Sequence, residues 1–148
     1  METYSSTLFE DIFEVTALNP DGKKVFESVN RLAATGTTFE CDLLLDINSE
    51  IYKVSEMDKL TLVLASTLNL DASPADHFSY NTQSGQEPTL ADNYEYVMHG
   101  RVFDVSHQKD GVVVIAASFG GLLMRLTGDQ RHLTSVLPDM RLYLLLKK

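Results

Sequence analysis

The sequence predicts an all-β fold, a barrel or a sandwich of about eight strands. Short apolar and β-branched runs recur along the 148-residue chain, as in strands that bury one face. Clusters of turn-forming residues separate these runs, and no long stretch shows the 3.6-residue period of an amphipathic helix. Such short connections favour antiparallel neighbours.

Four strands are expected in the first half of the chain: Leu8–Leu18, Val25–Thr35, Thr38–Ile47 and Lys59–Thr67. Each combines β-branched, aromatic or leucine residues in a short run. The first two are separated by Asn19-Pro20-Asp21-Gly22, where proline presets φ and glycine supplies a positive φ. A short helical turn is expected at Ser55–Asp58.

Four more strands are expected in the second half: Tyr94–Val105, Val112–Phe119, Leu122–Thr127 and Arg141–Lys147. Asp110-Gly111 is typical of a hairpin tip. Gly128-Asp129 offers an N-cap for a short helical segment over Gly128–Leu137. Gly120-Gly121 lacks the surroundings of a phosphate-binding loop, so it is interpreted as a β-bulge or a close approach of two backbones.

A polar stretch, Asn69–Asp92, lies between the two sets of strands. It is rich in Asp, Ser, Pro, Asn, Gln and Gly and predicts a long surface loop. The length of the chain favours one domain over residues 1–148, with a first half near 8–68, the loop at 69–92 and a second half at 93–148. No sequence repeat relates the halves.

The composition is that of a folded globular chain, with 44% hydrophobic and 22% charged residues. The formal net charge of −9 disfavours tight binding to a polyphosphate. The first 74 residues hold 5 basic and 13 acidic groups, whereas the remainder holds 7 and 8. The longest apolar run, Val112–Ala117, predicts no membrane span, and no targeting segment is expected at the amino terminus.

Residues suited to catalysis are sparse. The four histidines are scattered, at His77, His99, His107 and His132. Cys41 has no partner with metal-ligand spacing and is expected to be a small core residue, and a lone cysteine suits a reducing compartment. The acidic residues Glu10, Asp11, Glu14, Asp42 and Asp46 are interpreted as a solvated polar face. No catalytic residue, metal or cofactor is therefore expected.

The strand after the two glycines suggests a docking element. Alternation places Leu122, Met124 and Leu126 on one face, and Leu123 and Arg125 on the other. An arginine on the outer face beside two glycines is compatible with docking of a protein partner.

Ingredients for binding a single nucleic-acid strand are thin. Between Thr16 and Glu40 the basic and aromatic residues are Lys23, Lys24, Phe26, Arg31 and Phe39. Acidic residues lie among them, so any binding is expected to be weak, salt-sensitive and without sequence preference.

Five segments together resemble a known family: LFEDIFEV (Leu8–Val15), LVLASTL (Leu62–Leu68), YEYVMHGRVF (Tyr94–Phe103), FGGLLMRLTGD (Phe119–Asp129) and RLYLLLKK (Arg141–Lys148). In this order they strongly resemble the eighth subunit shared by eukaryotic nuclear RNA polymerases I, II and III. The resemblance runs over nearly the whole chain. FGGLLMRLTGD is its most specific segment, because patterning and turn chemistry alone do not demand that order of residues.

The resemblance implies an eight-stranded antiparallel barrel of two joined half OB-folds, with an Ω-like loop between them. It also implies a non-catalytic subunit, in the nucleus and nucleolus, that supports polymerase assembly and stability by docking on the largest subunit. No homo-oligomer is expected.

The docking residues expected on this sequence are Phe119, Gly120, Gly121, Leu123 and Arg125, within the segment that most resembles the family. The family's weak, non-specific single-stranded DNA site falls on Lys23, Lys24, Phe26, Arg31 and Phe39. Tyrosine is common in the family where this chain has Phe119, which removes a hydroxyl. The alternative is a free-standing single-strand-binding OB protein, which the charge of −9 disfavours.

Overall fold

The computed structural model describes residues 7–20, 27–68 and 89–148, and it confirms the eight-stranded, all-β prediction. The strands are β1 (Thr7–Leu18), β2 (Val29–Gly36), β3 (Asp42–Asn48), β4 (Lys59–Ala65), β5 (Tyr96–His107), β6 (Val112–Phe119), β7 (Leu122–Asp129) and β8 (Arg141–Lys147). The helical segments of the described residues are the short 3₁₀ turns η2 (Leu90–Asn93), η3 (Lys109–Gly111) and η4 (Gln130–His132).

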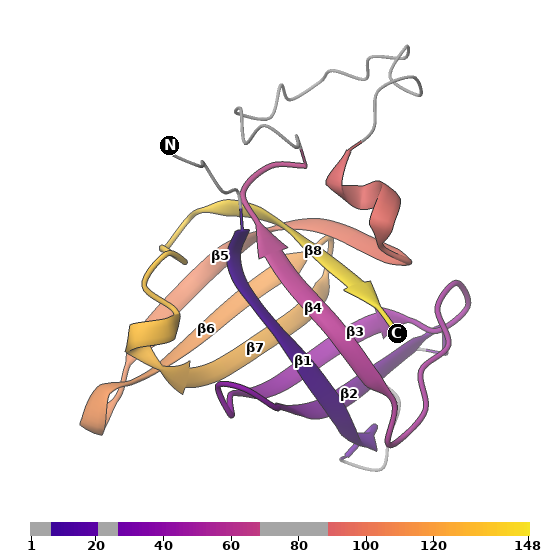
Figure 1. Cartoon of the computed structure of the whole chain (residues 1–148), viewed down its shortest axis with the longest axis horizontal. Coiled ribbons are helices and arrows are strands. Elements are labelled where there is room, and N and C mark those ends of the chain that lie inside the picture. The colour runs from indigo at the N-terminus through magenta and orange to yellow at the C-terminus, as the bar shows by residue number, and fades with distance from the viewer. Residues whose placement is uncertain (1–6, 21–26, 69–88) are drawn as a thin grey trace.

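The strands form one closed barrel in the order β1-β2-β3-β7-β6-β5-β8-β4, with every neighbouring pair antiparallel. Within each half of the chain the fourth strand returns to lie beside the first, as in a Greek key. The two halves meet at two seams, β3–β7 and β4–β8. The halves therefore share one strand order although their sequences show no repeat (Figure 1).

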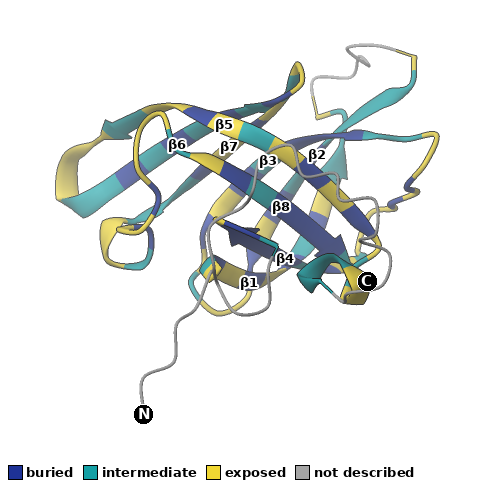
Figure 2. Cartoon of the chain, turned by 90° about the horizontal axis from the view of Figure 1, so that it is seen from above, coloured by how far each residue is buried: buried dark blue, intermediate teal, exposed yellow. Residues whose placement is uncertain are grey.

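The barrel interior is filled by alternate residues of each strand. On β6 the inward residues are Val113, Ile115, Ala117 and Phe119, all at most 4% exposed. Figure 2 shows this alternation as successive buried and less buried bands along the strands. Because closure pairs every strand on both sides, no open sheet edge is left to aggregate.

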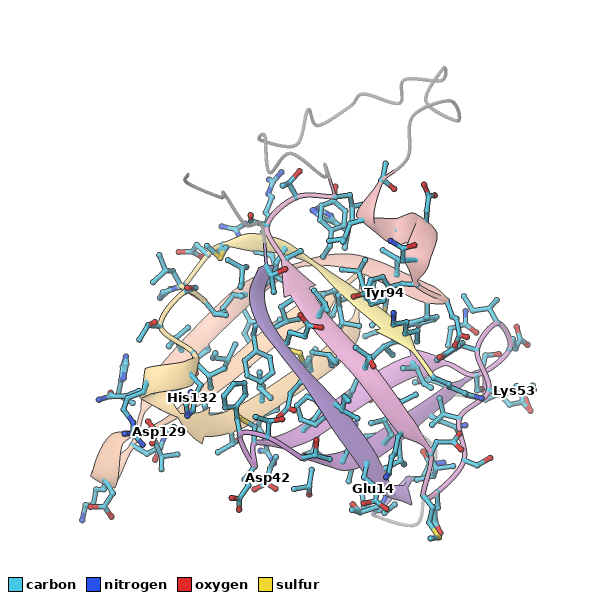
Figure 3. The ribbon with its side chains drawn as sticks, viewed as in Figure 1. Glu14, Asp42, Lys53, Tyr94, Asp129 and His132 are labelled. Carbon is cyan, nitrogen blue, oxygen red and sulfur yellow. The ribbon has the colours of Figure 1, made fainter. Side chains whose placement is uncertain are left out.

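The connections between the third and fourth strands of each half close the two ends of the barrel. Tyr52 and Val54 come from the β3–β4 connection, and Leu133 and Val136 come from the β7–β8 connection; all four belong to the core. The two connections lie at opposite ends, marked in Figure 3 by Lys53 and His132. Tyr52 also stacks on Tyr96, with ring centroids 5.2 Å apart.

Three local predictions differ from the structure. The strand expected from Thr38 begins only at Asp42, because the Thr38 and Phe39 amides donate to the Asp11 carboxylate instead of to a neighbouring strand. Ser55–Asp58 is a turn rather than a helix, because Met57 has a φ of 75° and the Asp58 amide donates to the Ser55 carbonyl. The predicted helical segment after Gly128 shortens to η4, where the Arg131 amide donates to the Asp129 carboxylate. The Asp110-Gly111 hairpin tip is confirmed, with φ of 63° and 77°.

Two of the acidic residues interpreted as a solvated face are buried, so that interpretation is wrong for Asp11 (4% exposed) and Asp46 (3% exposed). Asp11 accepts hydrogen bonds from three backbone amides, those of Ile12 (2.7 Å), Thr38 (3.1 Å) and Phe39 (3.0 Å). The Thr38 and Phe39 amides lie where the chain turns between β2 and β3, whereas Ile12 is the next residue of β1. The carboxylate thus replaces the ladder partners that this turn lacks.

The Asp46 carboxylate likewise replaces missing backbone partners, at the β3–β7 seam between the halves. Its carboxylate accepts from Arg31 Nε on β2 (2.7 Å) and Arg31 Nη2 (3.1 Å), and from the Leu123 amide on β7 (3.0 Å). The β3–β7 ladder runs only as far as the Leu45–Met124 pair. The Asp46 side chain therefore continues the seam one residue beyond the backbone pairing and joins three strands.

The two chain segments that flank residues 69–88 are tied together. The Leu90 amide donates to the Leu68 carbonyl at 2.8 Å, and Thr89 and Asp92 form a capping box at η2. Leu68, Leu90 and Tyr94 pack on a second small cluster outside the barrel, made of Val63, Ala65 and Leu145. These contacts join the two flanking segments, whereas residues 69–88 of the loop predicted at Asn69–Asp92 lie outside the described residues.

Replacing Asp46 with Ala is expected to lower the free energy of unfolding by ~3 kcal/mol or more, because Arg31 and the Leu123 amide lose their shared buried partner. Urea unfolding measures this. Asp42→Ala is the control on the same strand, since Asp42 is exposed, and it is expected to change stability by less than about 0.5 kcal/mol. Equal losses for both variants would contradict the role of Asp46.

Deleting most of Ser73–Glu87 is expected to leave the barrel folded. The base at Leu68 and Leu90 closes without that segment, and the entropy of closing a loop changes only slowly with its length. Thermal melts check this. A melting temperature more than about 8 °C below that of the intact chain, equivalent to roughly 2–4 kcal/mol at this chain length, would show that the deleted residues stabilise the barrel.

Candidate docking surface

In the part of the chain that the structure describes, the barrel interior holds no unpaired polar side-chain atom. Across residues 7–20, 27–68 and 89–148, every buried side-chain nitrogen and oxygen has a hydrogen-bond partner. The same residues contain no group of three His, Cys, Asp or Glu side chains placed to hold a metal. They also include no helix long and apolar enough to span a membrane.

Cys41 is a core residue, as predicted. It is fully buried, and burial, with help from nearby Asp11 and Asp42, raises the pKa of its thiol to about 11. A Cβ built on Gly128 would collide with the Cys41 sulfur, so the thiol fills the space that this glycine leaves. A thiol with a raised pKa is a poor nucleophile at neutral pH.

The outer face of β7 carries the features predicted for docking. Met124 and Leu126 point into the core, and Leu123 is 42% exposed with Arg125 exposed beside it. These two residues border an open groove of about 430 Å³. The residues that line the groove are Pro20, Arg31, Leu44, Phe103, Ala116, Leu123, Met124 and Arg125.

Arg125 lies between two apolar cross-strand neighbours, Leu44 on β3 and Ala116 on β6. The structure gives its guanidinium no ion pair and no hydrogen bond within the described residues. The acidic group of the groove region, Asp46, is already paired with Arg31. Arg125 thus offers its donors to an external acceptor, with apolar surface on both sides.

Phe119 lies inside the barrel rather than on this surface. Its ring is 4% exposed and covers Gly100 of β5, where an added Cβ would come within 2.5 Å of Phe119 Cδ1. The ring anchors the β6–β7 hairpin from within. Little of this side chain is left to contact a partner, and the packing requires no hydroxyl at this position.

Gly120 and Gly121 form the exposed two-residue tip of the β6–β7 hairpin, between the paired Phe119 and Leu122. Their φ angles are 68° and 99°, and an added Cβ at either position would meet nothing within 4 Å. The expectation of a bulge or a close approach of backbones is therefore wrong. Two glycines between paired strands are a known hairpin signal, and that signal was available in the sequence.

The structure does not assemble the predicted single-stranded DNA site from its described members. Lys23, Lys24 and Phe26 lie outside the described residues. The guanidinium of Arg31 donates to the Asp46 carboxylate through Nε and Nη2. Phe39 is half-buried, with its ring stacked on His132 at 4.2 Å between centroids.

Substitutions at the hairpin tip are expected to differ by position. Gly120→Asn is expected to be nearly neutral, because a φ of 68° suits asparagine, whereas Gly121→Ala, at 99°, is expected to cost ~1–2 kcal/mol. Urea unfolding of both variants measures the difference. Equal costs would show that φ is not the constraint at this tip.

Comparison with known proteins identifies the family of this chain. Residues 10–148 match the family described as RNA polymerase Rpb8. The chain is 45% identical over 145 residues to the Dictyostelium discoideum protein named DNA-directed RNA polymerases I, II, and III subunit rpabc3, covering 97% of this chain and 99% of that protein.

Two further relatives agree. An Arabidopsis thaliana protein named DNA-directed RNA polymerases II, IV and V subunit 8B is 46% identical, with 95% of each chain covered. A Saccharomyces cerevisiae protein named DNA-directed RNA polymerases I, II, and III subunit RPABC3 is 41% identical, with 97% of this chain and 99% of that protein covered. The chain therefore belongs to the RNA polymerase Rpb8 family.

Proposed function

We propose that this chain is a structural, non-catalytic subunit common to nuclear RNA polymerases I, II and III. The observation that carries the proposal is the end-to-end similarity to proteins named as polymerase subunits, which covers 97% of the chain and 99% of the Dictyostelium relative. The setting is the nucleus, including the nucleolus.

The chemistry of the barrel supports a structural role. Its two buried carboxylates, Asp11 and Asp46, are both occupied by backbone amides or by Arg31. Its cysteine has a raised pKa and is buried. These two carboxylates and this thiol hold the fold, which suits a chain that contributes a rigid body to an assembly.

The docking surface of this proposal is the outer face of β7 with the adjoining groove, and its partner is the largest subunit of the polymerase. Leu123 and Phe103 are 42% and 56% exposed, so together they expose apolar area that does not stabilise the isolated chain. Arg125 adds a cation of the type that is enriched in interfaces.

Single-stranded DNA binding receives no support from the described residues. Arg31 is neutralised by Asp46, and Phe39 is covered by His132. The net charge of −9 opposes a polyphosphate as well. The free-standing nucleic-acid-binding alternative is therefore treated as an outcome of the experiment below.

Leu123→Lys, alone or with Arg125→Glu, is expected to reduce recovery of the largest polymerase subunits by at least about 10-fold when the tagged chain is purified from nuclear extract. A charge placed in the apolar part of an interface is costly to bury. Mass spectrometry of the co-purified chains provides the measurement. Melting temperature is expected to stay unchanged, because both side chains are exposed.

Ile12→Lys is the matched control, because Ile12 is 44% exposed but lies on the outer face of β1. Its recovery is expected to stay near that of the unmodified chain. An equal loss in this control would move the docking surface away from β7. Purification of the unmodified chain without any polymerase subunit, bound to nucleic acid instead, would overturn the proposed function.

A further inference from the structure

Two arginines face each other on the outside of the barrel. Arg101 of β5 and Arg141 of β8 are direct cross-strand partners, and both are exposed. Like charges directly opposite on neighbouring strands destabilise a sheet. The arginine pair is therefore unfavourable for the stability of the sheet, and the fold itself does not require it.

Compensation from within the chain is slight. Arg101 contacts Asp139 at 3.3 Å, but the two side chains are 58% and 77% exposed, and such surface pairs contribute little. No ion pair or hydrogen bond of Arg141 appears among the described residues. Most of the positive charge of the two arginines is therefore available to an external anion.

The arginine pair is continuous with the proposed docking surface. Arg101 is paired with Ser118 of β6, and Ser118 is paired with Leu123 of β7, so one cross-strand row joins Arg141, Arg101, Ser118 and Leu123. At the usual spacing of neighbouring strands, Leu123 lies roughly 10 Å from Arg101 and roughly 14 Å from Arg141. Phe103, at the bulge of β5, is exposed beside the row.

This row combines an apolar end with a cationic end. Leu123, Phe103 and the groove supply the apolar end, and the two guanidiniums supply the other. The acidic residues facing the same side are Asp104 and Asp139, both exposed. They reduce the attraction for the dense phosphate charge of a nucleic-acid strand, which the net charge of −9 opposes further, and they leave the carboxylates of a peptide as the better match.

We propose that this row binds an acidic protein segment whose carboxylates pair with Arg101 and Arg141 and whose adjoining apolar side chain enters the groove beside Leu123. A guanidinium receives a carboxylate through two parallel hydrogen bonds, so each arginine can hold one carboxylate. That the partner is a polymerase subunit rests on the proposed function. The acidic and apolar chemistry of the bound segment does not depend on it.

The binding experiment uses fluorescence anisotropy with a labelled deca-glutamate peptide in low-salt buffer. Deca-serine serves as the uncharged peptide, and a labelled ten-residue oligothymidylate serves as the nucleic-acid probe. The Arg101→Gln/Arg141→Gln variant is expected to weaken deca-glutamate binding at least about 10-fold. Arg131→Gln removes the same charge at η4, where Arg131 is paired with Asp129, and is expected to leave binding unchanged.

Thermal melts separate binding from structure. Because the arginine pair is repulsive, the double variant is expected to melt at or above the temperature of the unmodified chain. A melting temperature several degrees lower would show that the arginines stabilise the barrel and would overturn the inference. So would a preference of the unmodified chain for oligothymidylate that is lost in the double variant.

Purification from nuclear extract distinguishes this inference from the proposed function. The double variant is expected to recover less polymerase than Arg131→Gln does. If the unmodified chain and the double variant recover polymerase equally and deca-glutamate does not bind, the inference fails and the proposed function stands. If deca-glutamate binds through the arginines but no polymerase is recovered, the proposed function fails and the acidic-segment site stands.

Discussion

The structure depends on joining two four-stranded halves into one barrel, and Asp46 is the side chain that secures one of the two seams. Backbone pairing between β3 and β7 stops at Leu45 and Met124. Beyond that point the Asp46 carboxylate holds the Leu123 amide on one side and Arg31 on the other. A closed barrel must satisfy its backbone groups at every strand boundary, and here a charged side chain does so where the ladder runs out.

Asp11 shows the same use of a buried carboxylate at the turn between β2 and β3. It occupies an inward position on β1 among Phe9 and Phe13, where an unpaired charge would be strongly destabilising. Its carboxylate accepts from two amides of that turn, Thr38 and Phe39, and from the Ile12 amide of β1. Gly36 lies beside this carboxylate, and a residue with a Cβ would not fit there, because that Cβ would lie 2.5 Å from Asp11 Oδ2. The acidic residues thus divide into solvated ones and two that replace backbone partners.

The same seam orients the surface assigned to docking. Asp46 fixes the amide of Leu123, and the inward neighbours Met124 and Leu126 lock β7 against the core. Leu123 and Arg125 are therefore presented by a strand with little freedom to move, which lowers the entropy lost when a partner binds. A rigid body with an apolar groove and a short cationic row is consistent with a subunit that acts by assembly rather than by chemistry.

The sequence by itself determined the all-β class, most strand positions, the inward and outward faces of β7, and the family. Strand periodicity and hairpin residues are local, so they can be read without a fold. Only the tertiary structure decided that Asp11 and Asp46 are buried, that Phe119 anchors the hairpin from inside, and that Arg101 and Arg141 are neighbours. Each of these depends on contacts between strands distant in the chain, such as β3 with β7 and β5 with β8, and residue patterns within one strand carry no record of which strand lies beside it.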